Sequence, residues 1–319
     1  MATISDTWVI GVSRASVMFG GSPERKAIKV SQLHVVAPKE DITWTKVVAP
    51  DIGLLNVRPR ELWHYRDLIV LLVYRDFVIS CRQTILGPIW WMLQPILLCV
   101  TYVLIFSVIA RVSTDGIPPV LFFLSGLTFW FYFIGVFSNV ANTFSSNASI
   151  FGQVYFPRLV MPIAWSISAL IKFSFQLAFL AVCYLVYVLY GSPVAPQWTL
   201  LLLPFVILYA AALATGCGLI MAALTSKYRD LTLTMPMIMR LWRYLSAVVI
   251  PMSAVPENYR CYFDWNPVVP AVEIFRHATL GSGTISLPQV FTGLGMTAIL
   301  LLSGLIAYSR ASLTSQDTV

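Results

Sequence analysis

Two arginines, Arg240 and Arg243, lie three residues apart in an apolar segment, so they share one face of a predicted helix. A charged side chain costs about 2.5–3.5 kcal/mol at the centre of a bilayer on insertion scales, so the pair needs a counter-charge or water. Near the inner mouth of a membrane domain the two guanidinium groups would suit an anionic ligand. They would equally suit lipid headgroups at the membrane surface, and both interpretations stay open.

Aromatic side chains indicate a second possible chemistry. Leu98, Tyr102 and Phe106 follow Trp91 at +7, +11 and +15, which places them on one face of a predicted helix. Aromatic rings stack on the apolar faces of sugars and need no fixed charge, so this face would suit a sliding carbohydrate polymer. A face turned towards lipid is the alternative, because Trp and Tyr are common at membrane interfaces.

The other reactive side chains form no recognisable catalytic or metal site. The five cysteines show no CxxC spacing, the three histidines are isolated, and no HExxH motif occurs. The sequence also has no GxxxxGK[ST] loop, the usual cradle for nucleotide phosphates. We therefore expect no catalytic residue, no metal and no cofactor in this chain. The net charge of +7 is better explained by membrane topology than by nucleic-acid binding.

The composition indicates a membrane protein. Of the 319 residues, 58% are hydrophobic and only 11% are charged, whereas soluble domains carry about 25% charged residues. Residues 1–82 hold 19 of the 35 charged side chains. We predict an all-α, polytopic membrane domain that follows a polar N-terminal segment, and we exclude a soluble globular enzyme.

Apolar segments with few or no charges predict six spans, each with at least the roughly 17 to 20 residues that a bilayer requires. Within a transmembrane domain over 83–310, they cover about 88–110, 120–144, 163–190, 200–224, 235–252 and 289–308. Residues 253–288 hold four prolines between short apolar stretches, and we expect short helices there that re-enter the outer leaflet. The distribution of Lys and Arg favours cytoplasmic termini, including a tail over 311–319.

Residues 59–82 predict an amphipathic helix at the cytoplasmic interface. Pro59 suits a first helical position, and the apolar side chains fall mainly in one half-circle opposite the charged ones. Such a helix would link the membrane domain to a cytoplasmic partner, or it would only lead into the first span. Residues 1–58 contain too few apolar side chains for a core of their own, and we expect a flexible or partner-docked cytoplasmic extension.

Four motifs occur in an order that resembles a known family. They are Tyr74-Arg75-Asp76 with the stretch from Arg82 to Trp90 and Gln94-Pro95, then Val154–Pro162, then Tyr228-Arg229-Asp230, and last Asn266-Pro267 followed by Arg276. Together they resemble the ABC-2-type permeases that export polysaccharide, such as O-antigen, capsule and teichoic-acid exporters. The resemblance covers about residues 58–310.

This resemblance implies an ABC-2 exporter fold, assembled as a homodimer with two copies of an ABC ATPase subunit that binds ATP and Mg²⁺. The chain would be the permease, in a bacterial inner membrane, for a lipid-linked polysaccharide of the undecaprenyl-pyrophosphate type. Arg240 and Arg243 would then be candidates for contact with the lipid pyrophosphate. Trp91, Tyr102 and Phe106 would be candidates for contact with the glycan in the channel.

The resemblance also implies roles for loop residues. Leu86 and Gly87 would narrow the cytoplasmic mouth as a gate, or they would only begin the first span. Seven residues would contact the ATPase and couple it to the permease: Tyr65, Arg75, Phe156, Pro157, Arg158, Arg229 and Asp230. Alternatively, these residues would simply form turns and solvate helix ends. Lys172 departs from the acidic or neutral residue expected in the third span.

Two other functions stay open. An ABC-2 permease that exports drugs or lipids would share the topology but would need no aromatic lining. An integral-membrane glycan-assembly enzyme would need an acidic catalytic cluster, and the cytoplasmic loops contain no paired carboxylates. Asp264 and Glu273 lie on the predicted outer side, where we expect solvent to surround them.

Overall fold

The computed structural model describes residues 59–82, 87–146, 156–157, 159–191, 197–228, 230–283 and 286–314. The chain divides into two units, residues 1–50 and 51–319, and all the described residues belong to the second. The predicted extension over 1–58 and the site residues Leu86, Arg158 and Arg229 lie outside the described residues.

Helices form all the regular secondary structure in the described ranges, which confirms the predicted all-α class. In chain order they are α1 (Pro59–His64), α2 (Arg66–Arg82), η1 (Gly87–Ile89), α3 (Trp90–Tyr102), η2 (Val103–Ile109), α4 (Pro119–Ala141), α5 (Thr143–Ser146), α7 (Val160–Leu189), η3 (Trp198–Leu202), α8 (Leu203–Lys227), α9 (Leu231–Tyr244), η4 (Met252–Ala254), α10 (Glu257–Asp264), α11 (Val268–Leu280) and α12 (Leu287–Thr314).

Five helical segments in this part of the chain are long and apolar enough to cross a membrane. They are Gly87–Ile109, Pro119–Ala141, Val160–Leu189, Trp198–Lys227 and Leu287–Ala311. The predicted span over 235–252 is not one continuous helix, because α9 ends at Tyr244 and turns follow it. A count of six continuous spans is therefore not confirmed.

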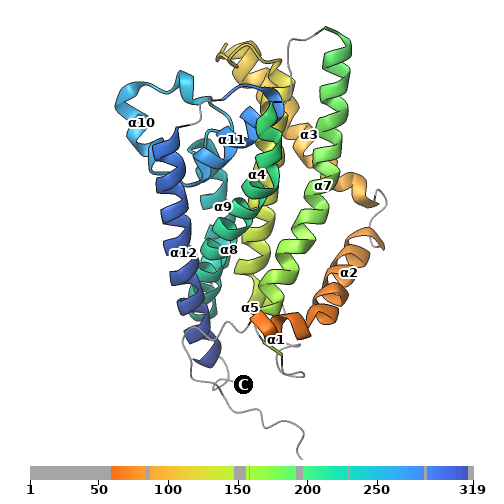
Figure 1. The fold of residues 1–319 in the computed structure, drawn as a ribbon, viewed down its shortest axis with the longest axis vertical. Helices are drawn as coiled ribbons and strands as arrows, with labels where there is room; N and C mark the ends of the chain where they lie inside the picture. Colours follow the sequence, from red (N-terminus) through yellow and green to blue (C-terminus); the bar gives the residue numbers. More distant parts are fainter. Residues whose placement is uncertain are drawn as a thin grey trace, which may run out of the picture. The chain divides into compact units, whose positions relative to one another are not determined.

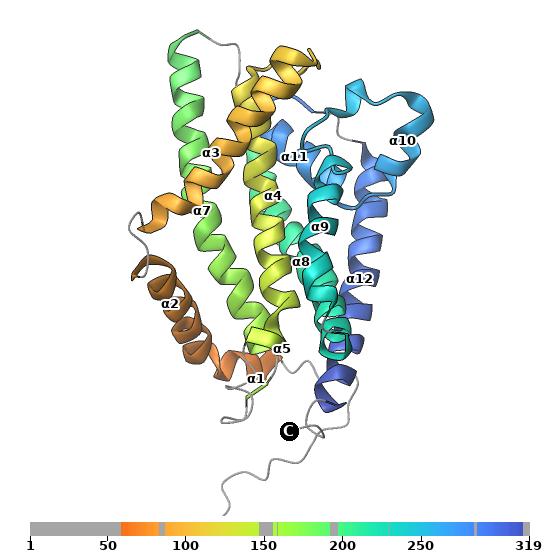
Figure 2. The ribbon, with the colours of Figure 1, turned by 180° about the vertical axis from the view of Figure 1, so that it is seen from behind.

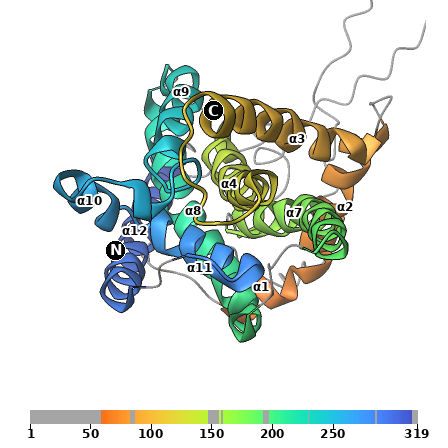
Figure 3. The ribbon, with the colours of Figure 1, turned by 90° about the horizontal axis from the view of Figure 1, so that it is seen from above.

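Helix α4 occupies the centre of the helical bundle. Its apolar window is 78% buried, far more than that of any other candidate span, because it packs against α7 on one side and α8 on another. Seen from above, α3, α7, α8 and α11 lie around it (Figure 3). Helix α12 packs on α8, and a Cβ at Gly304 would lie 2.5 Å from the carbonyl oxygen of Gly216. Glycine at position 304 therefore lets the two backbones touch.

The helices define two ends of the bundle, which we call the α2 end and the α11 end. At the α2 end, α2 lies beside α7, and α3 begins near the end of α2 (Figure 1). At the α11 end, α11 packs against α4, and α10 lies on the side of the bundle where α12 begins (Figures 1 and 2). The short helices α10 and α11 thus lie in the proline-rich region where the sequence predicted short helices, and they follow α9 in the chain.

Candidate functional site

A small hydrophobic cluster joins α2 to α7. Leu72 and Val73 of α2 are buried against Val160 and Met161 at the start of α7. Phe156, predicted to couple to an ATPase, is buried in the same cluster, so it holds the two helices together in this structure.

Of the other predicted coupling residues, the structure describes Tyr65, Arg75, Pro157 and Asp230. Tyr65 is half-buried at the turn between α1 and α2, and Pro157 is half-buried directly after Phe156. Arg75 is half-buried on α2, where its Nε has no hydrogen-bond partner among the described residues. Asp230 is exposed at the N-cap of α9. Their coupling roles stay predictions.

Large apolar side chains cover the outer face of α1 and α2. Trp63, Val70, Leu71 and Tyr74 are all exposed. Exposed apolar surface on a helix whose other face is buried suits lipid or a partner protein. Helix is present over residues 59–82 with a break at Tyr65, and its predicted role at the cytoplasmic interface stays a prediction.

Gly87 begins the segment that leads into the membrane. Its φ angle is +53°, in the left-handed region that favours glycine. A Cβ at this position would meet no atom within 4 Å, so the backbone angle rather than the available space is what demands glycine. The predicted gating role of Gly87 stays a prediction.

The three predicted glycan-contact rings have different neighbours. Trp91 lies 5.9 Å from the ring of Phe77 on α2 and 5.5 Å from the ring of Phe175 on α7. The ring centre of Tyr102 lies 5.6 Å from that of Phe106, and Tyr102 is only 3% exposed, so its ring packs inside the chain. In this structure Trp91 and Tyr102 do not form one exposed surface, and glycan contact by these rings stays a prediction.

The helix geometry changes directly after Tyr102. From Val103 to Ile109 the chain forms a π-helix, in which the backbone bonds run from residue i to i+5. The wider turn shifts the angular position of Phe106 relative to that expected for a continuous α-helix. Short π-helical segments give no clear signal in an apolar sequence.

Arg240 and Arg243 both lie on α9, as predicted, but in different surroundings. Arg240 is exposed. The guanidinium of Arg243 lies 5.6 Å from the ring centre of Tyr102 and 5.7 Å from that of Tyr244, within the range of cation–π attraction. The aromatic rings thus hold Arg243 against the protein, and pyrophosphate contact by either arginine stays a prediction.

Lys172 forms an ion pair that the sequence did not indicate. Its Nζ lies 3.1 Å from Oδ2 of Asp76, so the pair joins α7 to α2. The same ammonium lies 5.8 Å from the ring centre of Trp91 at the start of α3. A lysine in the middle of α7 is therefore compensated both by a carboxylate and by an aromatic face.

A second polar group, at the α11 end, is built around Asn266. Its Nδ2 donates to the carbonyl oxygen of Leu245 at 2.8 Å, and its Oδ1 accepts from the backbone N–H of Val268 at 3.1 Å. Nε1 of Trp242 donates to the same Oδ1 at 3.3 Å. One amide therefore ties the end of α9 to the start of α11, which explains why the Asn266-Pro267 motif stands there.

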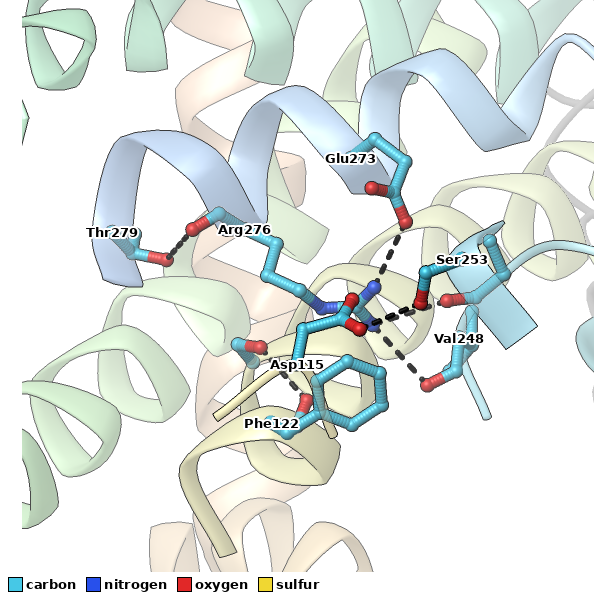
Figure 4. A network of polar contacts seen from close by, with 9 residues as sticks. Asp115, Phe122, Val248, Ser253, Glu273, Arg276 and Thr279 are labelled. Atoms are coloured by element: carbon cyan, nitrogen blue, oxygen red, sulfur yellow. Dashed lines mark hydrogen bonds and ion pairs between the residues drawn. The ribbon is translucent and has the colours of Figure 1, made fainter. Parts of the chain in front are cut away.

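Arg276 is the most deeply buried charge of the described region, at 1% exposed. Its Nη1 donates to Oε1 of Glu273 at 3.0 Å, and its Nη2 donates to the carbonyl oxygen of Ala247 at 3.0 Å. The guanidinium also stacks 3.9 Å from the ring centre of Phe122, at the start of α4 (Figure 4). Burial lowers the pKa of Arg276, and the nearby carboxylates of Glu273 and Asp115 oppose this change.

These contacts correct the expected exposure of Glu273 and explain why the predicted span over 235–252 is interrupted. Glu273 was expected in solvent, but it is 3% exposed, because it faces the interior beside Arg276 one helical turn away. Ala247 has a φ angle of +53°, which is unfavourable for a residue with a Cβ. The bonds from Asn266 and Arg276 to carbonyl groups after Tyr244 replace the bonds that a longer α9 would make, so the helix ends there.

The sequence carried signals for some of these residues. Arg276 and Asn266 belong to a recognised motif, and the spacing of three between Glu273 and Arg276 is typical of an ion pair on one helix. Nothing in the sequence joins Asp76 to Lys172, since only the packing of α2 on α7 brings them together. Within the described ranges, no three His, Cys, Asp or Glu side chains are grouped closely enough to hold a metal ion.

Comparison with known proteins identifies a related family. The family model described as ABC-2 type transporter matches residues 67–280, from the start of α2 to the last residue of α11. The O-antigen export system permease protein RfbA of Myxococcus xanthus is 29% identical over 199 residues, which is 62% of this chain and 74% of that protein.

Two further relatives are similar over a longer part of the chain. An O-antigen export system permease protein RfbA of Klebsiella pneumoniae is 24% identical, over 75% of this chain and 91% of its own length. The polysialic acid transport protein KpsM of Escherichia coli is 26% identical, over 72% of this chain and 89% of its own length. All four sequence motifs fall within residues 67–280, which the family model matches.

Proposed function

Because the chain belongs to the ABC-2 type transporter family, we propose that it is the permease subunit of an ABC exporter for a polysaccharide. The observation that carries this proposal is the match over residues 67–280, which includes α2, four of the five candidate spans and both short helices at the α11 end. The relatives named for O-antigen export and polysialic acid transport support the substrate class.

The chain itself is a transporter rather than an enzyme. Its sequence lacks a nucleotide-binding loop, so a separate ATPase subunit binds ATP and Mg²⁺ and supplies the energy. We further propose that two copies of the permease assemble with two ATPase subunits, and that the substrate is linked to an undecaprenyl-pyrophosphate-type lipid. In this arrangement the α2 end faces the cytoplasm of a bacterial cell, and both termini lie there.

The geometry supports a route for the energy of ATP hydrolysis. The ATPase would contact the exposed face of α1 and α2, which carries Trp63 and Tyr74. The cluster around Phe156 would pass a movement of α2 to α7, because buried apolar contacts resist separation. Gly87 lies between α2 and α3, so the same movement would reach the start of the first span.

Deletion of the gene in its native host tests the function. We expect lipid-linked polysaccharide to accumulate inside the cell while surface polysaccharide disappears, and the intact chain should restore export. A variant with three aspartates at Val70, Leu71 and Tyr74 should be made and inserted but should not restore export. Normal surface polysaccharide in the deletion strain would contradict the proposed substrate, and would favour an ABC-2 exporter of drugs or other lipids.

A further inference from the structure

A cavity of about 610 Å³ lies between α3, α4 and α7. Most of its lining is apolar, and its polar lining includes Gln94, Asn139, Lys172 and Gln176. A volume between 300 and 1,000 Å³ is typical of a ligand site. None of the residues predicted to act in coupling or gating lines it, and of the predicted glycan contacts only Trp91 does.

The polar groups gather where α3 begins. Trp91 is the second residue of α3, and its carbonyl oxygen accepts a hydrogen bond from Nε2 of Gln176 at 2.9 Å. Lys172 is one helical turn before Gln176 on α7, and Asn139 lies near the end of α4. Leu97, nearly two turns further along α3, is exposed beside the cavity. One end of the cavity is therefore polar and the rest is apolar.

The polar end of the cavity lies close to the ends of two candidate membrane spans, at Trp91 and at Asn139. The candidate span that contains α3 begins at Gly87, only a few residues before Trp91. Tryptophan and lysine are typical of the interface between hydrocarbon and water, where lipid phosphates lie. Lys172 thus lies where a phosphate of a membrane lipid would meet it, with space for a hydrocarbon chain beside it.

We propose that this cavity binds an anionic phospholipid, with the phosphate on Lys172 and one acyl chain along Leu97 and its apolar neighbours. A single lysine matches the single negative charge of a phosphodiester. Asp76 already lies 3.1 Å from the Lys172 ammonium, so the phosphate shares or replaces that carboxylate. Bound lipid therefore weakens an ion pair between α2 and α7, which links the site to the helix that faces the ATPase.

The competition gives two variants with opposite expected effects. Lys172→Met removes the cation and should weaken binding of phosphatidylglycerol about ten- to a hundredfold, the range for loss of a hydrogen bond to a charged group. Asp76→Asn removes the competing carboxylate and should tighten binding several-fold. A purely structural ion pair predicts instead that both variants only lower stability.

The experiment measures lipid binding to the full-length chain by native mass spectrometry after removal of bound lipid. Phosphatidylglycerol and phosphatidylcholine with the same acyl chains are titrated separately, and undecaprenyl phosphate forms a third arm. Lys227→Met is the matched control, because Lys227 is exposed at the end of α8 and outside the cavity. Thermal unfolding of each variant shows whether it is folded.

A third variant tests the cavity itself. Gly135 lines the cavity on α4, and a Cβ there would lie 3.7 Å from the Cβ of Ala169, an ordinary contact. The Gly135→Leu variant should therefore fold, fill part of the cavity and weaken the binding of both phospholipids.

The proposal expects tighter binding of phosphatidylglycerol than of phosphatidylcholine, weakened by Lys172→Met and strengthened by Asp76→Asn. Equal binding of the two phospholipids, or binding unchanged in Lys172→Met, would overturn it. The proposal would also be overturned if Lys172→Met weakened only the binding of undecaprenyl phosphate, because the cavity would then be a substrate site. None of these results depends on whether the exported molecule is a polysaccharide.

Discussion

Replacing Arg276 with methionine should destabilise the protein by about 3–5 kcal/mol, the usual cost of removing one partner of a buried ion pair. The carboxylate of Glu273, 3% exposed, would lose the cation that lies 3.0 Å away. The carbonyl oxygen of Ala247 would lose its donor, and the ring of Phe122 would lose a stacked charge. These losses share one side chain, so they do not add independently.

A double variant separates the charge from the packing. Glu273→Met combined with Arg276→Met removes both charges and leaves apolar side chains of similar length. Because replacement of a whole buried pair by apolar residues is often neutral or stabilising, most of the lost stability should return. Arg260→Met is the matched control on α10, where the arginine is exposed and its loss should change little.

Thermal unfolding in detergent, followed by tryptophan fluorescence, measures these effects. The single variant should unfold at a clearly lower temperature than the wild type, the double variant should lie between them, and Arg260→Met should match the wild type. An Arg276→Met protein as stable as the wild type would refute the reasoning, and so would a double variant that is less stable than the single one.

Three further predictions address the predicted site residues and the energy source. Tyr102→Ala should lower the amount of folded protein, since truncating a buried aromatic side chain costs about 3–5 kcal/mol of stability. Immunoblots measure this amount, and a normal amount of protein with slower export would favour glycan contact instead. Gly87→Ala should lower the stability of the protein by about 1–2 kcal/mol, because alanine is unfavourable in the left-handed conformation, and it should slow export in whole cells. Export at the wild-type rate would contradict a strict need for glycine. The purified chain should hydrolyse no ATP in a phosphate-release assay, and activity that persists after removal of every co-purified subunit would contradict a permease.

Much of the fold could be predicted because the bilayer itself limits it. The predicted spans over 88–110 and 120–144 correspond to helical segments over Gly87–Ile109 and Pro119–Ala141, and the third, fourth and sixth agree nearly as well. Each segment is a run of apolar residues, and most of its ends lie near a charge, a glycine or a proline. Such signals are local, so a sequence displays them directly.

The span over 235–252 shows where local signals fail. Its residues are apolar, but α9 ends at Tyr244 because Asn266 and Arg276, distant in sequence, bind the carbonyl groups of Leu245 and Ala247. Glu273 was expected in solvent for a related reason. A charged side chain is usually exposed, and only the fold shows that Glu273 is buried in an ion pair with Arg276. Both differences come from buried polar bonds between segments that only the tertiary structure brings together.

The site was predictable to a similar degree. Gly87 stands out by its residue type, and the structure shows the backbone angle that requires it. Phe156 was found as part of a motif, but its burial against α2 depends on how α7 packs. The pair of Asp76 and Lys172 could not be inferred, because neither residue's position along the chain reveals that α2 lies beside α7.

Transport by the reconstituted complex tests the central claim most directly. The permease and its ATPase would be placed in vesicles with the ATPase outside, and labelled lipid-linked polysaccharide would be added to the outer surface. The account predicts that the glycan becomes protected inside the vesicles only when ATP and both subunits are present. Protection without the ATPase subunit, or none when both subunits hydrolyse ATP, would contradict it.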